Sequence, residues 1–374
     1  MLTIGAPQAA GLNDSRWAKV LELGESLVAQ GEFPELSFQV QRAGQATEVH
    51  TFLREDSSGG VKKLESPRRY LVASLTKPIV AMGVLLLVED GLLSLNDRVS
   101  DWIPEFSEAS KRNITIRNLL THTSGLPDML PNNAELRKLH SPIATFVEGA
   151  CHALLEHLPS RGVQYQSMGY ALLTPIIERA SGVGIKEFFR TRIFDPLEMD
   201  RTCLGTSEGD NRTDIAEVQT PPEQMGGGEW NWNSEYWHQL GAPWGGLIST
   251  TEDLSKFCAS VLANGIGPNG RVFSSALVRT ATGNRLDDFP DIDPVQRRTR
   301  AWGCGWRHNW PDHRSCFSDL LPSNAVGHWG ATGTLYWLDL DRKISAVLLT
   351  TQPVDRSKSK LTHLSNAIVA AFED

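Results

Sequence analysis

The sequence predicts an α+β protein, in which the two ends of the chain build an α/β sandwich domain with one antiparallel sheet and a mainly helical domain is inserted between them. Apolar and polar residues alternate over residues 36–40, which is typical of a strand with two different faces. Two further strand-like runs, 334–340 and 343–350, flank a two-residue turn, as in a hairpin. Helical patterns fill the region between these strands, so the sheet domain is expected to be discontinuous.

The other elements can be placed in chain order. Asp14 and Ser15 can cap a first helix that ends near Gly31. A turn at Gly44 leads to a strand over residues 49–52. Apolar runs predict helices over residues 78–88 and 171–180. The apolar positions that mark a last helix are Leu361, Leu364, Ile368, Val369 and Phe372.

Two domains follow from this order. Residues 1–79 and 241–374 are expected to form the sheet domain, covered by the first and last helices. Residues 80–240 are expected to form the inserted helical domain. Because pockets often lie between domains, we expect the functional site in the cleft between these two parts.

Composition narrows the functional classes. The 374 residues are 40% hydrophobic and carry a net charge of -8, so no basic surface is available for nucleic acid. The five cysteines are odd in number and scattered, and they and the ten histidines lack metal-ligand spacing, which favours buried thiols in a reducing compartment. The N-terminal residues do not resemble a secretion signal, and no apolar run is long enough to cross a bilayer. We therefore expect a cytoplasmic protein without metal, cofactor, nucleic-acid or membrane partners, while the oligomeric state stays open.

The most informative stretch is Ser74-Leu75-Thr76-Lys77, at the start of the apolar helix over residues 78–88. Residues three apart lie on one side of a helix, so the hydroxyl and the amine would be neighbours. Serine is a poor nucleophile without a base, and lysine becomes a base only where burial or positive potential lowers its pKa. A helix N-terminus against the core could supply both influences.

Ser-x-x-Lys alone is a weak pattern, because it recurs at Ser357-Lys358-Ser359-Lys360, where a solvated charge run before the last helix is expected. A competing motif, Gly205-Thr206-Ser207-Glu208-Gly209, matches the nucleophile elbow of α/β-hydrolases. That elbow requires a buried strand before the serine and a helix after it. Charged residues flank the motif on both sides, with a proline among those before it, so Ser207 is predicted to lie in a surface turn.

Two more motifs follow in the chain. Tyr165-Gln166-Ser167 precedes the helix over residues 171–180, and Gly327-His328-Trp329-Gly330 opens a predicted strand. With the first motif they resemble the serine penicillin-recognising superfamily, which comprises class C β-lactamases, D-alanyl carboxypeptidases, D-aminopeptidases and family VIII carboxylesterases. Phrases typical of that family, such as Leu119-Leu120-Thr121-His122-Thr123-Ser124-Gly125-Leu126, cover most of residues 70–350. The resemblance implies a β-lactamase/transpeptidase-like fold.

The resemblance also implies roles for single residues. Ser74 would be the acylated nucleophile, Lys77 its base, and Tyr165 the hydroxyl that relays protons to the leaving group. A tyrosine could itself act as a base only beside a cation that stabilises its phenolate, and Lys77 would be that cation. The oxyanion hole would use the backbone amides of Ser74 and Ala331, with Ala331 on an edge strand.

Two departures from the family pattern bear on the substrate. The tyrosine motif usually ends in asparagine, which holds an acylamide side chain, but here the position is Ser167. The third motif usually begins with lysine, whereas His328 is mostly neutral at pH 7, and Trp329 next to it would add an apolar wall beside Gly330. These changes favour neutral esters over lactams and peptides that carry a carboxylate.

The sequence therefore predicts a serine hydrolase, above all a carboxylesterase acting on small to medium esters. Hydrolysis of β-lactams or D-amino-acid amides, acyl transfer, and a non-catalytic scaffold with the same fold remain alternatives. Tryptophans gather over residues 230–244, after Gly226-Gly227-Gly228, and over residues 302–310. They could wall a binding site or only pack long irregular segments, and the sequence does not decide between the two.

Overall fold

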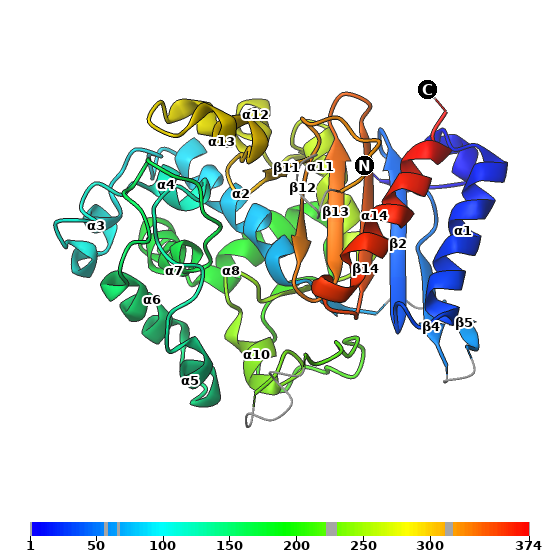
Figure 1. Ribbon diagram of the computed structural model, residues 1–374, viewed down its shortest axis with the longest axis horizontal. Helices are drawn as coiled ribbons and strands as arrows, with labels where there is room; N and C mark the ends of the chain where they lie inside the picture. Colours follow the sequence, from blue (N-terminus) through cyan, green and yellow to red (C-terminus); the bar gives the residue numbers. More distant parts are fainter. Residues whose placement is uncertain (1, 56–58, 66–67, 222–229, 311–316, 374) are drawn as a thin grey trace.

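The computed structural model describes residues 2–55, 59–65, 68–221, 230–310 and 317–373. A large sheet lies at one side of the molecule and most of the helices lie at the other (Figure 1). The α+β prediction is therefore confirmed.

The strands of the described residues form one large and two small sheets. Their bounds are β1 Thr3–Ile4, β2 Glu35–Arg42, β3 Gln45–Ala46, β4 His50–Arg54, β5 Val61–Lys63, β6 Tyr70–Leu71, β7 Cys203–Leu204, β8 Leu247–Ser249, β9 Ile266–Gly267, β10 Gly270–Arg271, β11 Arg307–His308, β12 Val326–Gly330, β13 Thr334–Asp339 and β14 Ile344–Thr350.

The large sheet joins both ends of the chain, as predicted. Its order is β1-β3-β2-β14-β13-β12-β11, with β4 and β5 continuing from β2. The predicted hairpin is the antiparallel pair β13 and β14, and β14 pairs with β2 over Leu36 to Arg42. The pairs are antiparallel except the short pair β1 and β3, which is parallel and was not anticipated.

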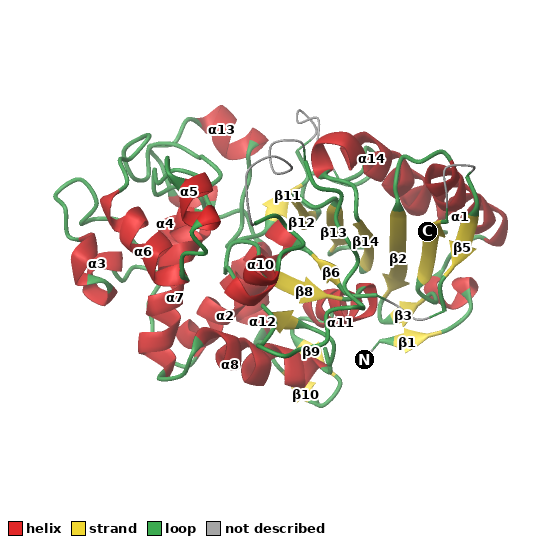
Figure 2. Cartoon of the chain, turned by 90° about the horizontal axis from the view of Figure 1, so that it is seen from below, coloured by secondary structure: helices red, strands yellow, loops and turns green. Residues whose placement is uncertain are grey.

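Helices cover both faces of this sheet. Helices α1 and α14 lie side by side on one face and α11 lies on the other, as Figure 2 shows. The α1/α14 side encloses an apolar core that includes Phe38, Trp337 and Leu348. The alternation in β2 does not mark an exposed face, because α11 buries the polar residues Ser37, Gln39 and Gln41 as well.

The helices vary from one turn to five turns. Their bounds are α1 Asp14–Ala29, α2 Thr76–Glu89, α3 Val99–Trp102, α4 Ile116–Leu120, α5 Asn133–Lys138, α6 Ile143–His152, α7 Met168–Ser181, α8 Ile185–Phe189, α10 Glu235–Leu240, α11 Thr251–Leu262, α12 Ser275–Thr282, α13 Pro294–Thr299 and α14 Val354–Ala371. The shorter turns are η1 Pro7–Ala10, η2 Ala73–Leu75, η3 Pro104–Phe106, η4 Arg190–Phe194, η5 Asp195–Leu197 and η6 Leu286–Asp288.

Helix α2 is the centre of the second core. It is apolar on every side, and residues 76–87 are all buried, so other elements must surround it. The α7 helix and, from the C-terminal third of the chain, α12 pack against it. The predicted boundary at residue 241 assigns α12 to the sheet domain, yet this helix lies with the helical part (Figure 1).

Two details of the helix predictions need correction. The cap of α1 is Asn13, whose side chain accepts the Arg16 amide hydrogen bond, and not Asp14 or Ser15. Helix α14 begins at Val354, so the second Ser-x-x-Lys pattern lies inside the helix and not in a polar stretch before it.

Candidate active site

Ser74 lies in the short turn η2, where the chain passes from β6 into α2. Its neighbour Ala73 has φ of +48°, a left-handed conformation that is unfavourable for a residue with a Cβ. The turn is held from the sheet side, where the hydroxyls of Thr332 and Thr334 donate hydrogen bonds of 2.7 and 2.8 Å to the carbonyls of Leu71 and Val72. These bonds fix a half-buried Ser74 at the junction of the sheet and the helices.

Lys77 is fully buried on the first turn of α2. Its Nζ lies 3.3 Å from Ser74 Oγ and donates a 2.8 Å hydrogen bond to the carbonyl of Trp244. Burial lowers the pKa of Lys77 to about 7, while the charge of Asp128 acts in the opposite direction. A large fraction of Lys77 is therefore unprotonated at neutral pH, and its amine can accept the serine proton.

Tyr165 completes a triangle with these two groups. Its hydroxyl lies 2.7 Å from Ser74 Oγ, and Lys77 Nζ lies 4.6 Å from the centre of its ring. Burial first and the charge of Asp128 second raise the pKa of Tyr165 above its ordinary value. The phenol is thus protonated at rest, so the electrostatics favour Lys77 as the base and Tyr165 as a proton donor.

The Tyr165 segment is positioned by the loop that follows α4. The amide of Gln164 donates to the His122 carbonyl at 2.9 Å, and the amide of Gln166 donates to His122 Nδ1 at 3.2 Å. Ser124 Oγ donates to the Gln166 side-chain oxygen at 2.5 Å. His122 is buried, and burial lowers its pKa well below the ordinary value. It is therefore a neutral residue with a structural role.

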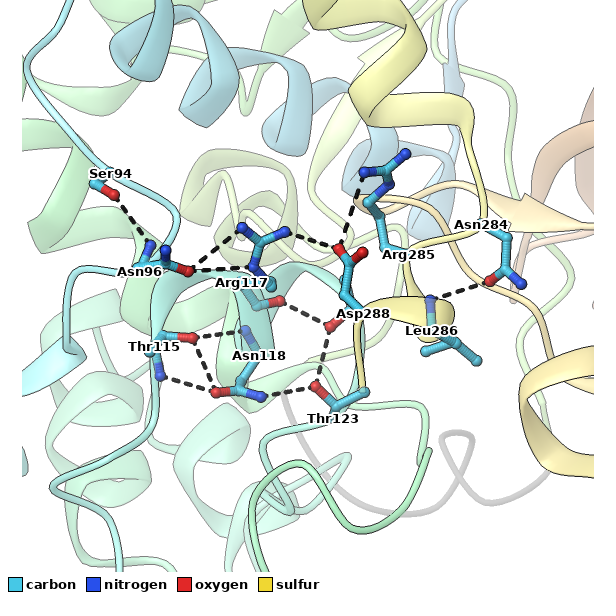
Figure 3. A network of polar contacts seen from close by, with 11 residues as sticks. Ser94, Asn96, Thr115, Arg117, Asn118, Thr123, Asn284, Arg285, Leu286 and Asp288 are labelled. Carbon is cyan, nitrogen blue, oxygen red and sulfur yellow. Dashed lines mark hydrogen bonds and ion pairs between the residues drawn. The ribbon is translucent and has the colours of Figure 1, made fainter. Parts of the chain in front are cut away.

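A network of polar contacts attaches the loop that follows α4 to this helix (Figure 3). Asn118 Nδ2 donates to Thr123 Oγ1 at 2.9 Å, and Asn118 Oδ1 accepts from the Thr115 amide at 3.0 Å. On the other side of α4, Arg117 forms a 2.9 Å ion pair with Asp288. The loop that orients Tyr165 is therefore fixed by side chains remote from the reacting atoms.

Ser167 and a residue that sequence reasoning missed, Asp128, lie next to Tyr165. Ser167 is buried at the start of α7, and its hydroxyl donates a 2.7 Å hydrogen bond to Asp128 Oδ1. The predicted substrate contact of Ser167 is therefore already engaged by a protein partner. Asp128 lies two residues after a family phrase, but no spacing relates it to Tyr165, so only the fold brings Asp128 and the Tyr165 segment together.

His328 lies beside Tyr165 on β12, with ring centres 5.9 Å apart. Its Nδ1 is 2.7 Å from the Trp329 carbonyl, which can only accept, so Nδ1 carries the proton and Nε2 is left as an acceptor. Burial lowers the pKa of His328 well below its ordinary value. The site therefore has a neutral group at this position.

Trp329 points to the opposite face of the sheet. Successive strand residues alternate, and Trp329 packs against Phe317 and the guanidinium of Arg307. The prediction that it adds a wall to the site next to His328 does not fit this orientation. Instead, Trp302 stacks on Tyr165 at 6.0 Å between ring centres and approaches His122 edge-on at 4.4 Å.

The predicted oxyanion residues lie at the end of β12. A Cβ on Gly330 would come within 2.3 Å of the Val72 carbonyl, so glycine is needed for the strand to approach the Ser74 turn this closely. Ala331 is the first residue of the turn between β12 and β13, and it is exposed. β11 pairs only with Val326 and Gly327 of β12, so the Gly330 end of β12, which Ala331 follows, has no strand partner on that side among the described residues.

The other tryptophans serve packing in most cases. Trp306 stacks on Phe257 in the core, and the Arg137 guanidinium packs against the rings of both Trp230 and Trp237. Of the two clusters, only Trp302 contacts Tyr165 by ring stacking in the part of the chain that the structure describes. Gly226, Gly227 and Gly228 lie outside the described residues.

The competing candidates do not form sites. Ser207 is exposed in a turn that no helix follows, and its amide is held by Asp210, as the surface-turn prediction requires. Cys151, Cys258 and Cys304 are buried free thiols and Cys203 is partly buried, whereas Cys316 lies outside the described residues. Among residues with described positions, no cluster of histidine, cysteine, aspartate or glutamate could hold a metal, and no helix is long and apolar enough to span a bilayer.

A serine hydroxyl in contact with a buried lysine and a tyrosine is, on this fold, the arrangement typical of serine hydrolases with a β-lactamase fold. The Beta-lactamase family model matches residues 22–370, and the chain belongs to that family. Penicillin-binding protein 4* of Bacillus subtilis (strain 168) is 36% identical over 147 residues, which are 38% of this chain and 32% of that protein. The match thus spans about a third of this curated relative.

Solved structures show the same fold over nearly the whole chain. EstCE1, a hydrolase with promiscuous acyltransferase activity, has a TM-score of 0.76 at 16% identity, covering 95% of this chain and 99% of that one. The D-amino acid amidase from Ochrobactrum anthropi SV3 has a TM-score of 0.75 at 21% identity, covering 96% and 99%. At such identities the likeness establishes the fold and leaves the substrate open.

Proposed function

We propose that this protein is a serine hydrolase that forms an acyl-enzyme on Ser74 and acts on carboxylic esters. One observation carries the proposal: the amine of Lys77, with a pKa of about 7, lies 3.3 Å from the Ser74 hydroxyl, which also contacts Tyr165 at 2.7 Å. A hydroxyl between an unprotonated amine and a phenol has both a proton acceptor and a proton donor within reach.

The preference for esters rests on the groups around the triangle. A lysine at position 328 would offer a cation to a substrate carboxylate, whereas His328 is buried with a lowered pKa and stays neutral. Ser167 Oγ donates its hydrogen bond to Asp128, and a serine has no side-chain amide to hold a peptide-like acyl chain. A neutral ester needs neither contact.

The proposed reaction proceeds in two halves. Lys77 takes the proton of Ser74 Oγ as this oxygen bonds to the ester carbonyl carbon, and the amides of Ser74 and Ala331 would stabilise the oxyanion. The tetrahedral intermediate collapses when its C–O bond to the alcohol breaks and Tyr165 donates its proton to the leaving alkoxide; Tyr165 then regains a proton from Lys77. Water attacks the acyl-enzyme by the same transfers and releases the acid and free Ser74.

The test combines labelling and turnover. Mass spectrometry after treatment with a fluorophosphonate should find the adduct on Ser74, and p-nitrophenyl esters should be cleaved faster than nitrocefin or D-alanyl amides. Ser74→Ala should abolish both signals, while the matched control Ser207→Ala should keep them. Absence of an adduct on Ser74 would favour a non-catalytic scaffold, and loss of turnover in Ser207→Ala alone would move the nucleophile to Ser207.

A further inference from the structure

A groove in the helical part of the molecule is separate from the reacting groups. It has a volume of about 930 Å³ and is lined by residues of α6, α7 and α8, and both α6 and α8 contact α7 (Figure 1). Thr174, which lines this α6–α8 groove, lies about two helical turns along α7 from Ser167. Ser74, Lys77 and Tyr165 do not line it. A molecule in this groove would therefore not occupy the active site.

The walls of the α6–α8 groove are mainly apolar. Ile143 and Val147 lie four residues apart on α6, so they face the groove from the same side of that helix. Both are only half-buried, although they are large apolar residues. An apolar hollow of this volume can take up most of a small organic molecule. The other large apolar residues that line it are Ile103, Pro142, Pro175, Ile185 and Leu240.

Two glutamates at the groove have no cation of their own. Glu105 and Glu148 line it, and neither forms an ion pair with a lysine, arginine or histidine of the described residues. Their charges act on the inside of the groove, where Cys151 lies. Burial first, and then Glu105 and Glu148, raise the pKa of the Cys151 thiol to about 11, although Lys111 acts in the opposite direction. The groove therefore has a negative potential.

The cations at the groove are already held by backbone carbonyls. Lys186 Nζ donates a 2.8 Å hydrogen bond to the Gln239 carbonyl, and Arg179 donates to the Trp102 carbonyl. Four glutamates line the groove against these two permanent cations. The remaining titratable groups there are engaged in the pairs Glu178 with the Ile185 amide, Glu187 with Arg190, and His152 with Glu108.

These features select one kind of ligand. An alkyl chain gains free energy from leaving water in an apolar groove, whatever its head group. A cationic head group gains in addition from unpaired carboxylates at the edge, whereas an anionic head group is repelled by them. We propose that the α6–α8 groove binds a small amphiphilic cation, an alkyl chain with a protonated amino group. The chain lies against Ile143 and Val147, and the ammonium group lies near Glu105 and Glu148. This site does not depend on the acyl-enzyme chemistry of Ser74.

Three probes with the same chain can test the proposal. Octylammonium, octanol and octanoate differ in the charge of the head group, and at neutral pH the amine is protonated and the acid is ionised. Isothermal titration calorimetry below the micellar concentration gives the Kd of each. Octylammonium should bind more tightly than octanol by about 2-fold to 30-fold, the range of one or two exposed ion pairs. Octanoate should bind most weakly.

A variant that fills the groove locates the binding. Ala144 is an exposed residue of α6 that lines the groove, so Ala144→Trp adds volume there without disturbing the core. It should weaken the binding of octylammonium by at least about 10-fold, because the chain loses its apolar walls. Ala134→Trp is the matched control, since Ala134 is exposed on α5 and does not line the groove. Ala144→Met replaces Ala144→Trp if the latter does not fold.

A second variant tests the charge. Glu105→Gln/Glu148→Gln should bring the Kd values of octylammonium and octanol close together and leave that of octanol unchanged. Glu22→Gln/Glu25→Gln removes the same charge from exposed positions of α1, on the opposite side of the molecule (Figure 1), and should keep the preference. This control separates a local effect from a change in net charge.

The outcomes separate this site from the proposed function. If octylammonium binds no more tightly than octanol, if Ala144→Trp binds it like the wild type, or if the α1 control loses the preference as well, the groove proposal is wrong. Cleavage of p-nitrophenyl esters is measured on the same preparations. If the groove binds octylammonium as expected and no ester is cleaved, only the proposed function fails.

Discussion

Replacing Lys77 by methionine should make the protein more stable, by an amount that depends on pH. The folded pKa of Lys77 is about 7, against an ordinary value of 10.5. At one pH unit per 1.36 kcal/mol, burying the amine costs about 5 kcal/mol below neutral pH. The unfolded state binds the extra proton between these two values, so wild-type stability rises with pH through that window and the cost vanishes above it.

Methionine has a similar length, carries no charge, and loses the hydrogen bond to the Trp244 carbonyl and the longer contact with Ser74 Oγ, which together cost about 1–3 kcal/mol at every pH. Urea unfolding of the variant and the wild type should therefore show a stability difference that shrinks by about 3 kcal/mol between about pH 6 and about pH 9. The matched control is Lys111→Met, because Lys111 is equally buried but pairs with Glu108 at 3.0 Å, and its loss should destabilise the protein. If the unfolding free energies of Lys77→Met and the wild type change with pH in the same way, the lowered pKa of Lys77 is refuted.

Further expectations concern turnover and folding. For a neutral ester, kcat/KM should rise with pH with a midpoint of about 7, because only unprotonated Lys77 accepts the serine proton; a flat profile would contradict this. In Asp128→Asn this midpoint should move to lower pH, because the Asp128 charge raises the pKa of Lys77 in the wild type and the variant lacks that charge. A shift of the midpoint to higher pH would contradict this. Tyr165→Phe should lower kcat by about 10²-fold to 10⁴-fold while keeping the ring beside Lys77 and hence a normal melting temperature; full activity would remove Tyr165 from the reaction. Asn118→Ala should lower stability by about 1–3 kcal/mol in thermal unfolding, because Thr123 loses its donor, and unchanged stability and kcat would show that the network does not position the loop.

Most of the fold could be predicted because its signals are local. The hairpin of β13 and β14 follows from two apolar runs around a short turn, and α2 follows from an uninterrupted apolar stretch. The burial of both faces of the sheet could not be predicted from β2. A strand that is buried on both faces and a strand that is buried on one face can show the same alternation of apolar and polar residues. The position of α12 beside α2 depends on contacts between residues almost 200 positions apart, which no local pattern encodes.

In the site, too, the residues close in sequence could be predicted and those brought together by the fold could not. Ser74 and Lys77 belong to one helical turn, so their spacing alone brings them together. Tyr165 lies 91 residues from Ser74, and only the family resemblance connected the two before the fold did. The family resemblance did not indicate Asp128 or Trp302, because their positions depend on which residues the folded loops bring next to Tyr165.

The electrostatics of the site argue that Asp128 does more than hold Ser167. Its charge raises the pKa values of both Lys77 and Tyr165, so at neutral pH it reduces the unprotonated fraction of the base and makes the phenol a weaker acid. An asparagine could keep the bond from Ser167 without either effect. For a neutral ester, replacing this carboxylate by an amide should therefore increase the unprotonated fraction of Lys77 at neutral pH and make Tyr165 the stronger proton donor.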